Sequence, residues 1–432
     1  MVRFVTAGES HGQGLLIIVE NVPAGLPIDE DYIGVHLARR QKGYGRGGRM
    51  LIEQDWAHII SGVRHGTTLG SPIGMRIENR DWANWEEAMS VRPIEGEPQS
   101  PRSQRVTRLR PGHADLPGAM KYGFNDVRNV LERSSARETA ARVAAGAVAL
   151  RLLEEFGIAV RSHVLSIGSI RAEPAAEIDW QAVEDSPVRC ADSEAAERMT
   201  AEIDATKDAG DTVGGIVEII AENVPIGLGS HVSWDRKIDG RVTQALMSIN
   251  AVKAVSIGPG WDIVHKRGSE VQDVIEPVTD PDRPWQRRTN NLGGTEGGMT
   301  NGMPLTAQFA IKPIATLMHP LPSVDLDTGE EVLAHYERSD ICQAPPACVV
   351  GEAMVALVLA EAFMEKFGGD SVSETRRNFE GYIKTVGPVW STSSQLLSRD
   401  TQSPTPPQGE GGAIENRRTS PDNSMLAFAS RV

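Results

Sequence analysis

The stretch Ser135-Ala-Arg-Glu-Thr-Ala-Ala-Arg-Val-Ala-Ala-Gly-Ala-Val-Ala-Leu150 is dense in small side chains and carries clear helix signals. Ser135 and Glu138 have the spacing of a capping box, and Gly157 follows Phe156 as a C-terminal stop signal. A helix with so little side-chain bulk lets neighbouring elements approach closely on several faces. The stretch therefore predicts a long helix buried between layers of secondary structure.

A second Ala-rich run, Val349–Ala360, predicts a similar helix. It ends at Glu365-Lys-Phe-Gly368, where the first ends at Glu154-Glu-Phe-Gly157. This likeness suggests an internal duplication, although Ala-rich core helices also resemble one another by composition alone. Strand-like segments stand between the helices without a regular βαβ alternation, which favours an α+β fold with antiparallel sheets. These segments are Leu15–Val19, Gly215–Ile220 and Thr306–Ile311.

The composition is that of a soluble globular protein: 432 residues, 40% of them hydrophobic, with a formal net charge of -14. An acidic envelope repels nucleic acid and anionic membranes, so any anionic ligand must meet a local cationic pocket. The first residues lack the long apolar stretch of a signal peptide, and we expect a cytoplasmic location. Cys190, Cys342 and Cys348 are odd in number and scattered, which predicts reduced thiols rather than disulfides or a zinc site.

The composition changes near the C-terminus. From about Ser391 onward, Ser, Thr, Pro and Gly dominate and too little apolar surface remains to offset the entropy of ordering the chain. We therefore expect one catalytic domain over residues 1–390 and a disordered tail over residues 391–432. The acidic stretch Ala172–Asp208, with a helical patch at Ser193–Ile203, is expected to form a peripheral insertion.

Two Gly-rich motifs match known signatures in the wrong context. Gly8-Glu-Ser-His-Gly12 fits the G-x-S-x-G nucleophile elbow of serine hydrolases, but only seven residues precede it, too few for the sheet on which an elbow stands. Gly43-Tyr-Gly-Arg-Gly-Gly48 fits the dinucleotide fingerprint, yet a predicted helix, Tyr32–Lys42, precedes it where a strand is required. Arg46 and Arg49 in that loop could instead grip phosphate or carboxylate; a solvated charged loop is the alternative.

Cations gather around one histidine. Arg108-Leu-Arg-Pro-Gly-His-Ala-Asp115 places His113 in a Pro-Gly turn, and Arg133-Ser-Ser-Ala-Arg137 opens the predicted helix. A helix N-terminus with Arg and hydroxyl neighbours favours an oxyanion. Further on, Arg338 and Asp340 stand before the second Ala-rich helix, where they could act as anion clamp and proton acceptor or form an ordinary ion pair.

Nine segments together resemble the motif series of the chorismate synthase family: GESHG, GYGRGGRM, PGHADL, KYG, RSSARETAARVAAGA, SINAVKAVSIGPG, NNLGGTEGGMTNG, KPIAT and RSDICQAP. They run in family order from residue 8 to about residue 360. The resemblance implies a layered sandwich of helices and two antiparallel four-stranded sheets, assembled as a homotetramer.

The same resemblance implies a carbon–oxygen lyase of the shikimate pathway, which serves aromatic amino acid biosynthesis. Its reaction would be the anti-1,4-elimination of phosphate from 5-enolpyruvylshikimate 3-phosphate, giving chorismate, with reduced FMN as cofactor. The implied partners are this small-molecule substrate and further copies of the chain, and an external flavin reductase is allowed for. Neither nucleic acid, nor membrane, nor metal is implied.

The resemblance also assigns roles to residues. His11 and His113 would be the paired catalytic histidines, and Asp340 would relay a proton near the flavin. Arg40 and Arg46 would meet the anionic substrate, at a place to which the family also assigns NADP. The remaining residues would hold the flavin: Arg133, Ser134, Ser135, Asn250, Ala251, Gly297, Lys312, Pro313, Ile314, Ala315, Thr316 and Arg338.

Two other function classes remain as alternatives. A flavin-dependent oxidoreductase acting on an anionic substrate would oxidise NADPH without the phosphorylated substrate. A binder of RNA or of another phosphate-rich ligand would use the Arg clusters without chemistry. Such a binder is expected to have a broad basic face with interleaved aromatics, whereas aromatics make up 5% of this chain and its net charge is negative.

Overall fold

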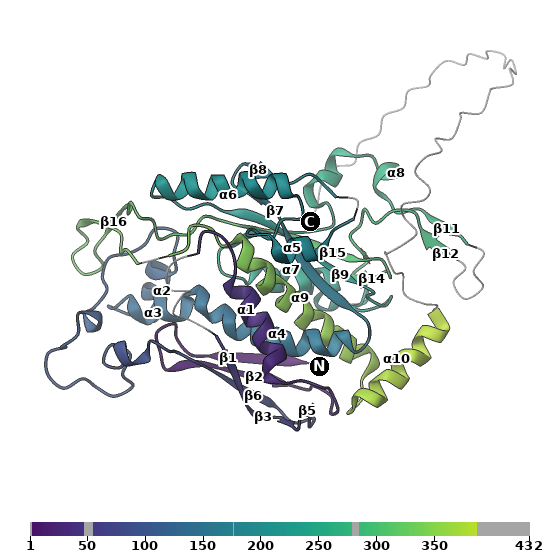
Figure 1. The fold of residues 1–432 in the computed structure, drawn as a ribbon, viewed down its shortest axis with the longest axis horizontal. Helices are drawn as coiled ribbons and strands as arrows, with labels where there is room; N and C mark the ends of the chain where they lie inside the picture. Colours follow the sequence, from purple (N-terminus) through teal and green to yellow (C-terminus); the bar gives the residue numbers. More distant parts are fainter. Residues whose placement is uncertain (1, 47–54, 176, 279–284, 338, 387–432) are drawn as a thin grey trace, which may run out of the picture. The chain divides into compact units, whose positions relative to one another are not determined.

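Two long helices, α4 (Thr139–Glu154) and α9 (Ala344–Phe367), pack against each other in the computed structural model (Figure 1). A Cβ atom added to Gly146 of α4 would lie 2.3 Å from the Cβ atom of Ala353 of α9, closer than side-chain atoms tolerate. The small residues therefore allow the two helices to pack closely, as predicted. The structure describes residues 2–46, 55–175, 177–278, 285–337 and 339–386. The predicted tail, residues 391–432, lies outside the described residues.

The start of α4 differs from the predicted capping box. Ser135 caps a short 3-10 turn, η4 (Ala136–Glu138), by accepting a hydrogen bond from the Arg137 backbone N–H. The Glu138 carboxylate binds Thr6 at 2.9 Å and Arg142 at 2.8 Å instead of the Ser135 backbone. The prediction of Ser135 as a capping residue is therefore confirmed. The predicted bond from the Ser135 backbone N–H to Glu138 is wrong, because the Glu138 carboxylate accepts hydrogen bonds from Thr6 and Arg142 instead.

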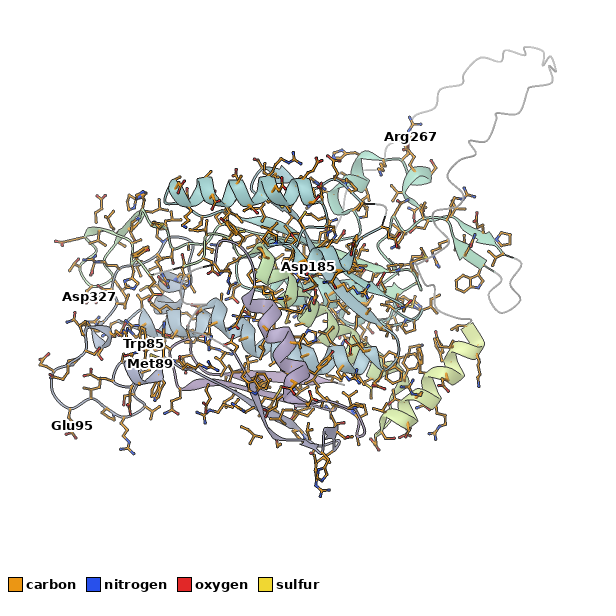
Figure 2. The ribbon with its side chains drawn as sticks, in the orientation of Figure 1. Trp85, Met89, Glu95, Asp185, Arg267 and Asp327 are labelled. Atoms are coloured by element: carbon orange, nitrogen blue, oxygen red, sulfur yellow. The ribbon has the colours of Figure 1, made fainter. Side chains whose placement is uncertain are left out.

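A four-stranded antiparallel sheet has the order β1 (Arg3–Ala7), β2 (Gly14–Glu20), β6 (Ile73–Glu78) and β3 (Ala57–Ser61). In β2, Leu15, Ile17 and Val19 are buried while the residues between them are exposed, the alternation of a sheet with one covered face. Helix α1 (Glu30–Gln41) and α4 pack on this sheet. The chain after β6 includes Trp85, Met89 and Glu95, which are labelled in Figure 2.

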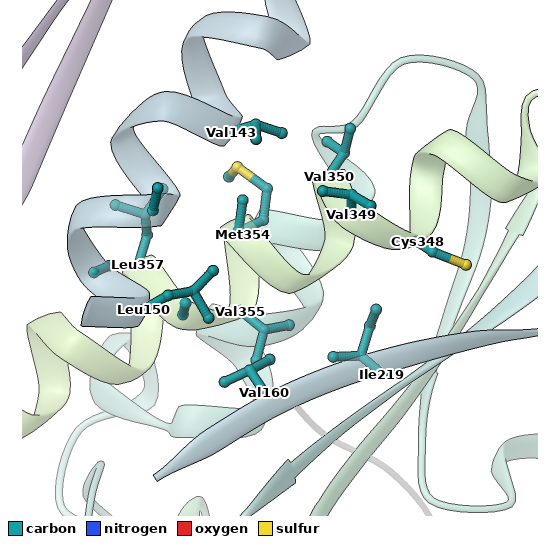
Figure 3. Packing of buried hydrophobic residues seen from close by; sticks show 14 of the residues in the cluster. Val143, Leu150, Val160, Ile219, Cys348, Val349, Val350, Met354, Val355 and Leu357 are labelled. Carbon is teal, nitrogen blue, oxygen red and sulfur yellow. The ribbon is translucent and has the colours of Figure 1, made fainter. Parts of the chain in front are cut away.

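A second antiparallel sheet has five strands, in the order β10 (Val252–Ile257), β15 (Leu305–Ile311), β9 (Gly215–Glu222), β7 (Ala159–Ile167) and β8 (Ile170–Arg171). It has one strand more than the resemblance implied, because a tight turn at Gly168, with φ of +55°, lets the two-residue β8 pair with the end of β7. Helix α9 packs on β7 and β9, with Val355 beside Val160 (Figure 3). Helix α7 (Ile238–Met247) packs on β10 and α9.

The fold within the described residues is thus α+β with antiparallel sheets, as predicted. Four two-stranded hairpins complete the sheets: β4 (Val63–Arg64) with β5 (Thr67–Thr68), β11 (Ile275–Pro277) with β12 (Trp285–Arg287), β13 (Thr295–Glu296) with β14 (Met299–Thr300), and β16 (Pro322–Val324) with β17 (Glu331–Leu333). The other helices are α2 (Asp115–Tyr122), α3 (Arg128–Ser134), α8 (Gly268–Val271) and α10 (Val372–Val386), with 3-10 turns η2 (Trp82–Asn84), η3 (Pro101–Ser103), η5 (Trp234–Arg236) and η6 (Gly260–His265).

The acidic stretch Ala172–Asp208 forms α5 (Trp180–Asp185) and α6 (Ser193–Asp208) at the edge of the five-stranded sheet. A buried ion network ties this stretch to the long helices. Arg39 of α1 donates hydrogen bonds to Glu184 of α5 and Glu352 of α9, and Arg189 pairs with the same two carboxylates. The side chain of Glu352 is only 1% exposed. The stretch is therefore anchored to the core by charge as well as by apolar packing.

Helix α9 is the one helix in the described part of the chain that is long and apolar enough to cross a membrane, but 94% of its most apolar window is buried within the protein. That burial is typical of the core helix of a soluble protein. The three cysteines are buried and free of disulfides, as predicted. Burial raises the pKa of Cys342 to about 12 and that of Cys348 to about 11, so both stay thiols at neutral pH.

Candidate active site

A cavity of about 420 Å³ opens where the N-terminal ends of α4 and α9 meet the loop after β1 and the chain after β15. Its volume lies in the range of small-molecule sites. The sequence-predicted site residues that line it are His11, Arg40, Arg46, His113, Ser134, Ser135, Asn250, Ala251, Lys312, Ile314, Ala315, Thr316 and Asp340. Fold topology thus brings together segments as far apart in the sequence as His11 and Asp340.

His11 is held by a buried carboxylate. Its Nδ1–H donates to Glu132 of α3, with Nδ1 2.8 Å from Oε2 and 3.0 Å from Oε1, and its backbone N–H donates to Oε2 at 2.9 Å. Glu132 is only 2% exposed and also pairs with Arg128. Because a carboxylate only accepts hydrogen bonds, it fixes a proton on Nδ1. Nε2 is then the nitrogen through which the ring can exchange a proton with a ligand.

His113 has a carboxylate partner of the same kind. Its Nδ1 lies 2.5 Å from Oδ1 of Asp115, which is fully buried at the start of α2. Arg110 donates to both oxygens of that carboxylate, at 2.8 and 3.0 Å. Burial raises the pKa of Asp115, but hydrogen bonds from His113 and Arg110 outweigh that effect and leave it well below its usual range. Asp115 is therefore an anion that orients both the histidine and an arginine of the cavity.

Two arginines of the cavity share one buried carboxylate. Arg40, in the last turn of α1, and Arg137, in the η4 turn, each pair with Asp55, at 3.1 and 2.9 Å. Arg40 also donates to the Thr139 hydroxyl at 3.0 Å. Both guanidinium groups belong to the cavity lining, where they suit an anionic ligand.

Arg46 and Asp340 both line the cavity and form an ion pair, with Arg46 Nη1 3.4 Å from Asp340 Oδ2. Both side chains are largely buried, at 11% and 13% exposure. Arg338, which the sequence offered either as an anion clamp beside Asp340 or as its ion-pair partner, lies outside the described residues. The observed pair links the predicted proton acceptor to a predicted substrate arginine.

Asn250, Ala251 and Lys312 form another part of the lining. Asn250 donates from Nδ2 to the Ser134 carbonyl at 2.9 Å, and its buried Oδ1 has no hydrogen-bond partner within the described part of the chain. Ala251 has a φ of +67°, the left-handed region that a non-glycine residue adopts only when its surroundings hold it there. Its carbonyl accepts from the Lys312 backbone. Burial lowers the pKa of Lys312, and the charge of Lys253 adds to that effect.

Sequence reasoning missed Arg110, Arg137 and Glu337 as lining residues, and Glu132 and Asp115 as histidine partners. Glu337 lies near Arg110 and His335, at 3.7 and 3.3 Å. Burial raises the pKa of Glu337, but the His335 hydrogen bond and the charges of Arg110, His335 and His11 outweigh it and lower the pKa to about 2. Only the HADL spacing of His113 and Asp115 could have been recognised from sequence as a local pair.

Three predicted flavin residues do not line the cavity. Arg133 binds the backbone carbonyls of Thr6 and Gly8, at 3.0 Å each, and so anchors the loop that carries His11. Gly297 lies in the turn between β13 and β14, with a φ of +60°. Pro313 stands beside the lining residues Lys312 and Ile314 without lining the cavity itself.

The fold shows that the two Gly-rich motifs, Gly8–Gly12 and the one that contains Arg46, do not have the structural context of the signatures they match. Ser10 follows β1, an edge strand, whereas a nucleophile elbow stands on a central strand. The loop with Arg46 follows helix α1, as predicted, and not a strand. Neither a serine hydrolase site nor a dinucleotide fold is present in the described part of the chain.

Comparison with known proteins adds independent information. Residues 2–364 match the family model described as chorismate synthase. A chorismate synthase of Symbiobacterium thermophilum is 55% identical over 390 residues, covering 89% of this chain and 99% of the relative. A chorismate synthase of Geobacter sulfurreducens is 54% identical over 397 residues, covering 89% and 99%. A crystal structure of a chorismate synthase superposes with a TM-score of 0.70 at 42% identity, covering 89% of this chain and 98% of that one.

Proposed function

The chain belongs to the chorismate synthase family, so its reaction is the elimination of phosphate from 5-enolpyruvylshikimate 3-phosphate to give chorismate, and we propose that the cavity described above carries it out. The observation that carries this assignment of the site is the pair of histidines, His11 and His113, each held by its own buried carboxylate beside a group of arginines. Such an arrangement combines positioned proton donors with strong anion binding.

Substrate binding rests on the arginines. The substrate carries one phosphate and two carboxylates, and Arg40, Arg46, Arg110 and Arg137 all reach the cavity. Hydrogen bonds to charged groups are worth roughly 1.5–3 kcal/mol each. The acidic remainder of the protein confines this attraction to one place. The family's NADP assignment at Arg40 and Arg46 is compatible with the same positive charge.

His11 is proposed to protonate the oxygen of the leaving phosphate. Glu132 holds the orientation of the ring through Nδ1, which directs Nε2 to deliver the proton. His113 is proposed to hold the cofactor, with Asp115 setting which ring nitrogen carries the proton. Asp340 is proposed to accept a proton at its carboxylate, and its contact with Arg46 places it beside a residue proposed to bind the substrate.

The residues present fit reduced FMN as cofactor. The unpartnered, buried Oδ1 of Asn250 is an acceptor that suits a ring N–H, and the hydroxyls of Ser134, Ser135 and Thr316 suit a polar side chain or phosphate. When bound, reduced FMN supplies electron density to the substrate and recovers it, so that the reaction has no net redox change. Lys312, Pro313, Ile314, Ala315, Ala251, Arg133, Gly297 and Arg338 complete the proposed set.

We extend the proposal to the organisation of the enzyme. The catalytic domain spans residues 1–390, and α4 and α9 form an inner helical layer between the two main sheets, which their packing on β2 and on β7 supports. The enzyme is proposed to be a cytoplasmic homotetramer supplied with reduced flavin by an external reductase. Residues 391–432 are proposed to take no part in catalysis.

An anaerobic assay of phosphate release tests the function. Full-length protein, photoreduced FMN and the enolpyruvyl substrate should release phosphate and form chorismate without net oxidation of the flavin. NADPH oxidation in the absence of the phosphorylated substrate, with no phosphate release in its presence, would favour the oxidoreductase alternative instead.

A further inference from the structure

Trp85 lies flat against the imidazole of His11, with ring centroids 3.7 Å apart and planes inclined by 20°. We propose that Trp85 is a positioning residue that fixes the plane of the His11 ring and thereby the direction in which Nε2 delivers its proton. The proposal rests on the function proposed above, because that function gives His11 its role as an acid.

The carboxylate alone does not fix the ring. Glu132 holds His11 at Nδ1, which fixes one atom of the imidazole but leaves the ring able to tilt about the Nδ1···carboxylate direction. A flat contact with an indole removes that tilt, since stacking defines a plane. The two contacts together define the position of Nε2, where an error of about 1 Å can cost about 100-fold in rate.

The indole is itself tied to the same turn as the histidine. Trp85 Nε1–H donates to Asp81 Oδ2 at 2.9 Å, and the Asp81 backbone N–H donates to Asn79 Oδ1 at 3.0 Å. Asn79 is buried and donates from Nδ2 to the carbonyl of Gly12, the residue that follows His11, at 2.9 Å. These three hydrogen bonds connect Gly12, through Asn79 and Asp81, to the indole. The backbone beside His11 and the Trp85 ring are therefore held by the same hydrogen-bond network.

The charges around the indole agree with this role. The guanidinium groups of Arg102 and Arg128 lie 5.1 and 5.4 Å from the Trp85 ring centre, and Arg128 also pairs with Glu132. An aromatic face attracts cations and shields them from water on that side. The two guanidinium groups therefore help to hold the indole in place against the His11 ring.

A set of three full-length variants tests the proposal. Trp85→Phe keeps an aromatic face, Trp85→Leu keeps apolar bulk without one, and Trp82→Leu removes a tryptophan from the same turn, η2, as the matched control. We expect Trp85→Leu to lower kcat by about 10–100-fold with KM little changed, and Trp85→Phe to recover most of the loss. Trp82→Leu should keep kcat within about threefold of the parent enzyme.

A spectroscopic readout separates positioning from loss of fold and needs no substrate. In protein with ¹³C-labelled histidines, the Hε1 resonance of His11 should be shifted upfield by the indole ring current, and His11→Asn identifies the signal by removing it. Trp85→Leu should move that resonance downfield while the other histidine signals stay in place, which also shows that the variant is folded. Unchanged kcat in Trp85→Leu, or a His11 signal that does not move, would overturn the proposal. An inactive parent enzyme would overturn the proposed function and leave the resonance test standing.

Discussion

Replacing Gly146 by alanine should separate the two central helices. The added Cβ would lie 2.3 Å from the Ala353 Cβ and 2.5 Å from its Cα, about 1 Å closer than an ordinary contact. The Cα atom belongs to the backbone of α9, so the strain can be relieved only by moving a helix. Overpacking of this kind costs about 1–3 kcal/mol, against roughly 1 kcal/mol gained from helix propensity. We expect a net loss of about 1–2 kcal/mol in the free energy of unfolding.

Gly381→Ala is the matched control, because Gly381 lies within α10 and an added Cβ there meets nothing within 4 Å. That variant should gain roughly 0.5–1 kcal/mol from propensity alone. Denaturant midpoints followed by circular dichroism, at equal protein concentration, give the difference between the two variants. Gly146→Ala should also raise KM, since the N-terminal ends of both helices line the cavity. If Gly146→Ala were as stable as Gly381→Ala, the inferred contact between α4 and α9 would be wrong.

Four further predictions concern the cavity. His11→Ala and His113→Ala should each lower turnover by about 10²–10⁴-fold in a folded protein that still binds both ligands; an unfolded variant, seen by circular dichroism, would indicate a structural histidine. Asp340→Asn should slow single-turnover phosphate release by about 10²–10⁴-fold at saturating substrate, and an unchanged rate would remove it from catalysis. Arg46→Ala should weaken substrate binding by roughly 1.5–3 kcal/mol with little effect on flavin, and equal losses in separate titrations would contradict the assignment. Asp115 has a lowered pKa in the folded state, so its contribution to stability is present above about pH 4 and lost as the pH falls. Thermal midpoints between about pH 2 and pH 5 should therefore fall less steeply in Asp115→Asn than in the parent, and identical slopes below about pH 4 would contradict this.

The strands and helices were predicted well because each follows from the side chains of its own segment. The β-branched runs became β2, β9 and β15, and the small-residue stretches became α4 and α9. The helix boundaries were predicted less well. Helix α9 begins at Ala344, five residues before the predicted start. Pro345 and Pro346 lie in its first turn, where proline is tolerated, and so do not end the helix there. The extra strand β8 rests on a two-residue pairing that carries almost no sequence pattern.

The site was predicted as a set of segments rather than as a set of contacts. The motif series identified thirteen residues that line one cavity. The order of the motifs along the chain, however, does not show which distant residues form pairs. Glu132 stands 121 residues from His11, and neither α3 nor the loop after β1 shows which carboxylate will meet which ring. The same holds for Asp340, whose described partner, Arg46, comes from a loop nearly 300 residues earlier.

Helix α1 places two consecutive arginines in different environments. Arg39 enters the buried ion network with Glu352, and Arg40 turns about 100° around the helix to reach the cavity and Asp55. Inserting or deleting one residue upstream within α1 would rotate both side chains at once, removing the Arg39 contact of Glu352 and leaving the cavity short of a cation. Length variation among homologues should therefore be absent from α1 and collect in surface connections, such as the Thr328–Gly329 turn of the β16–β17 hairpin.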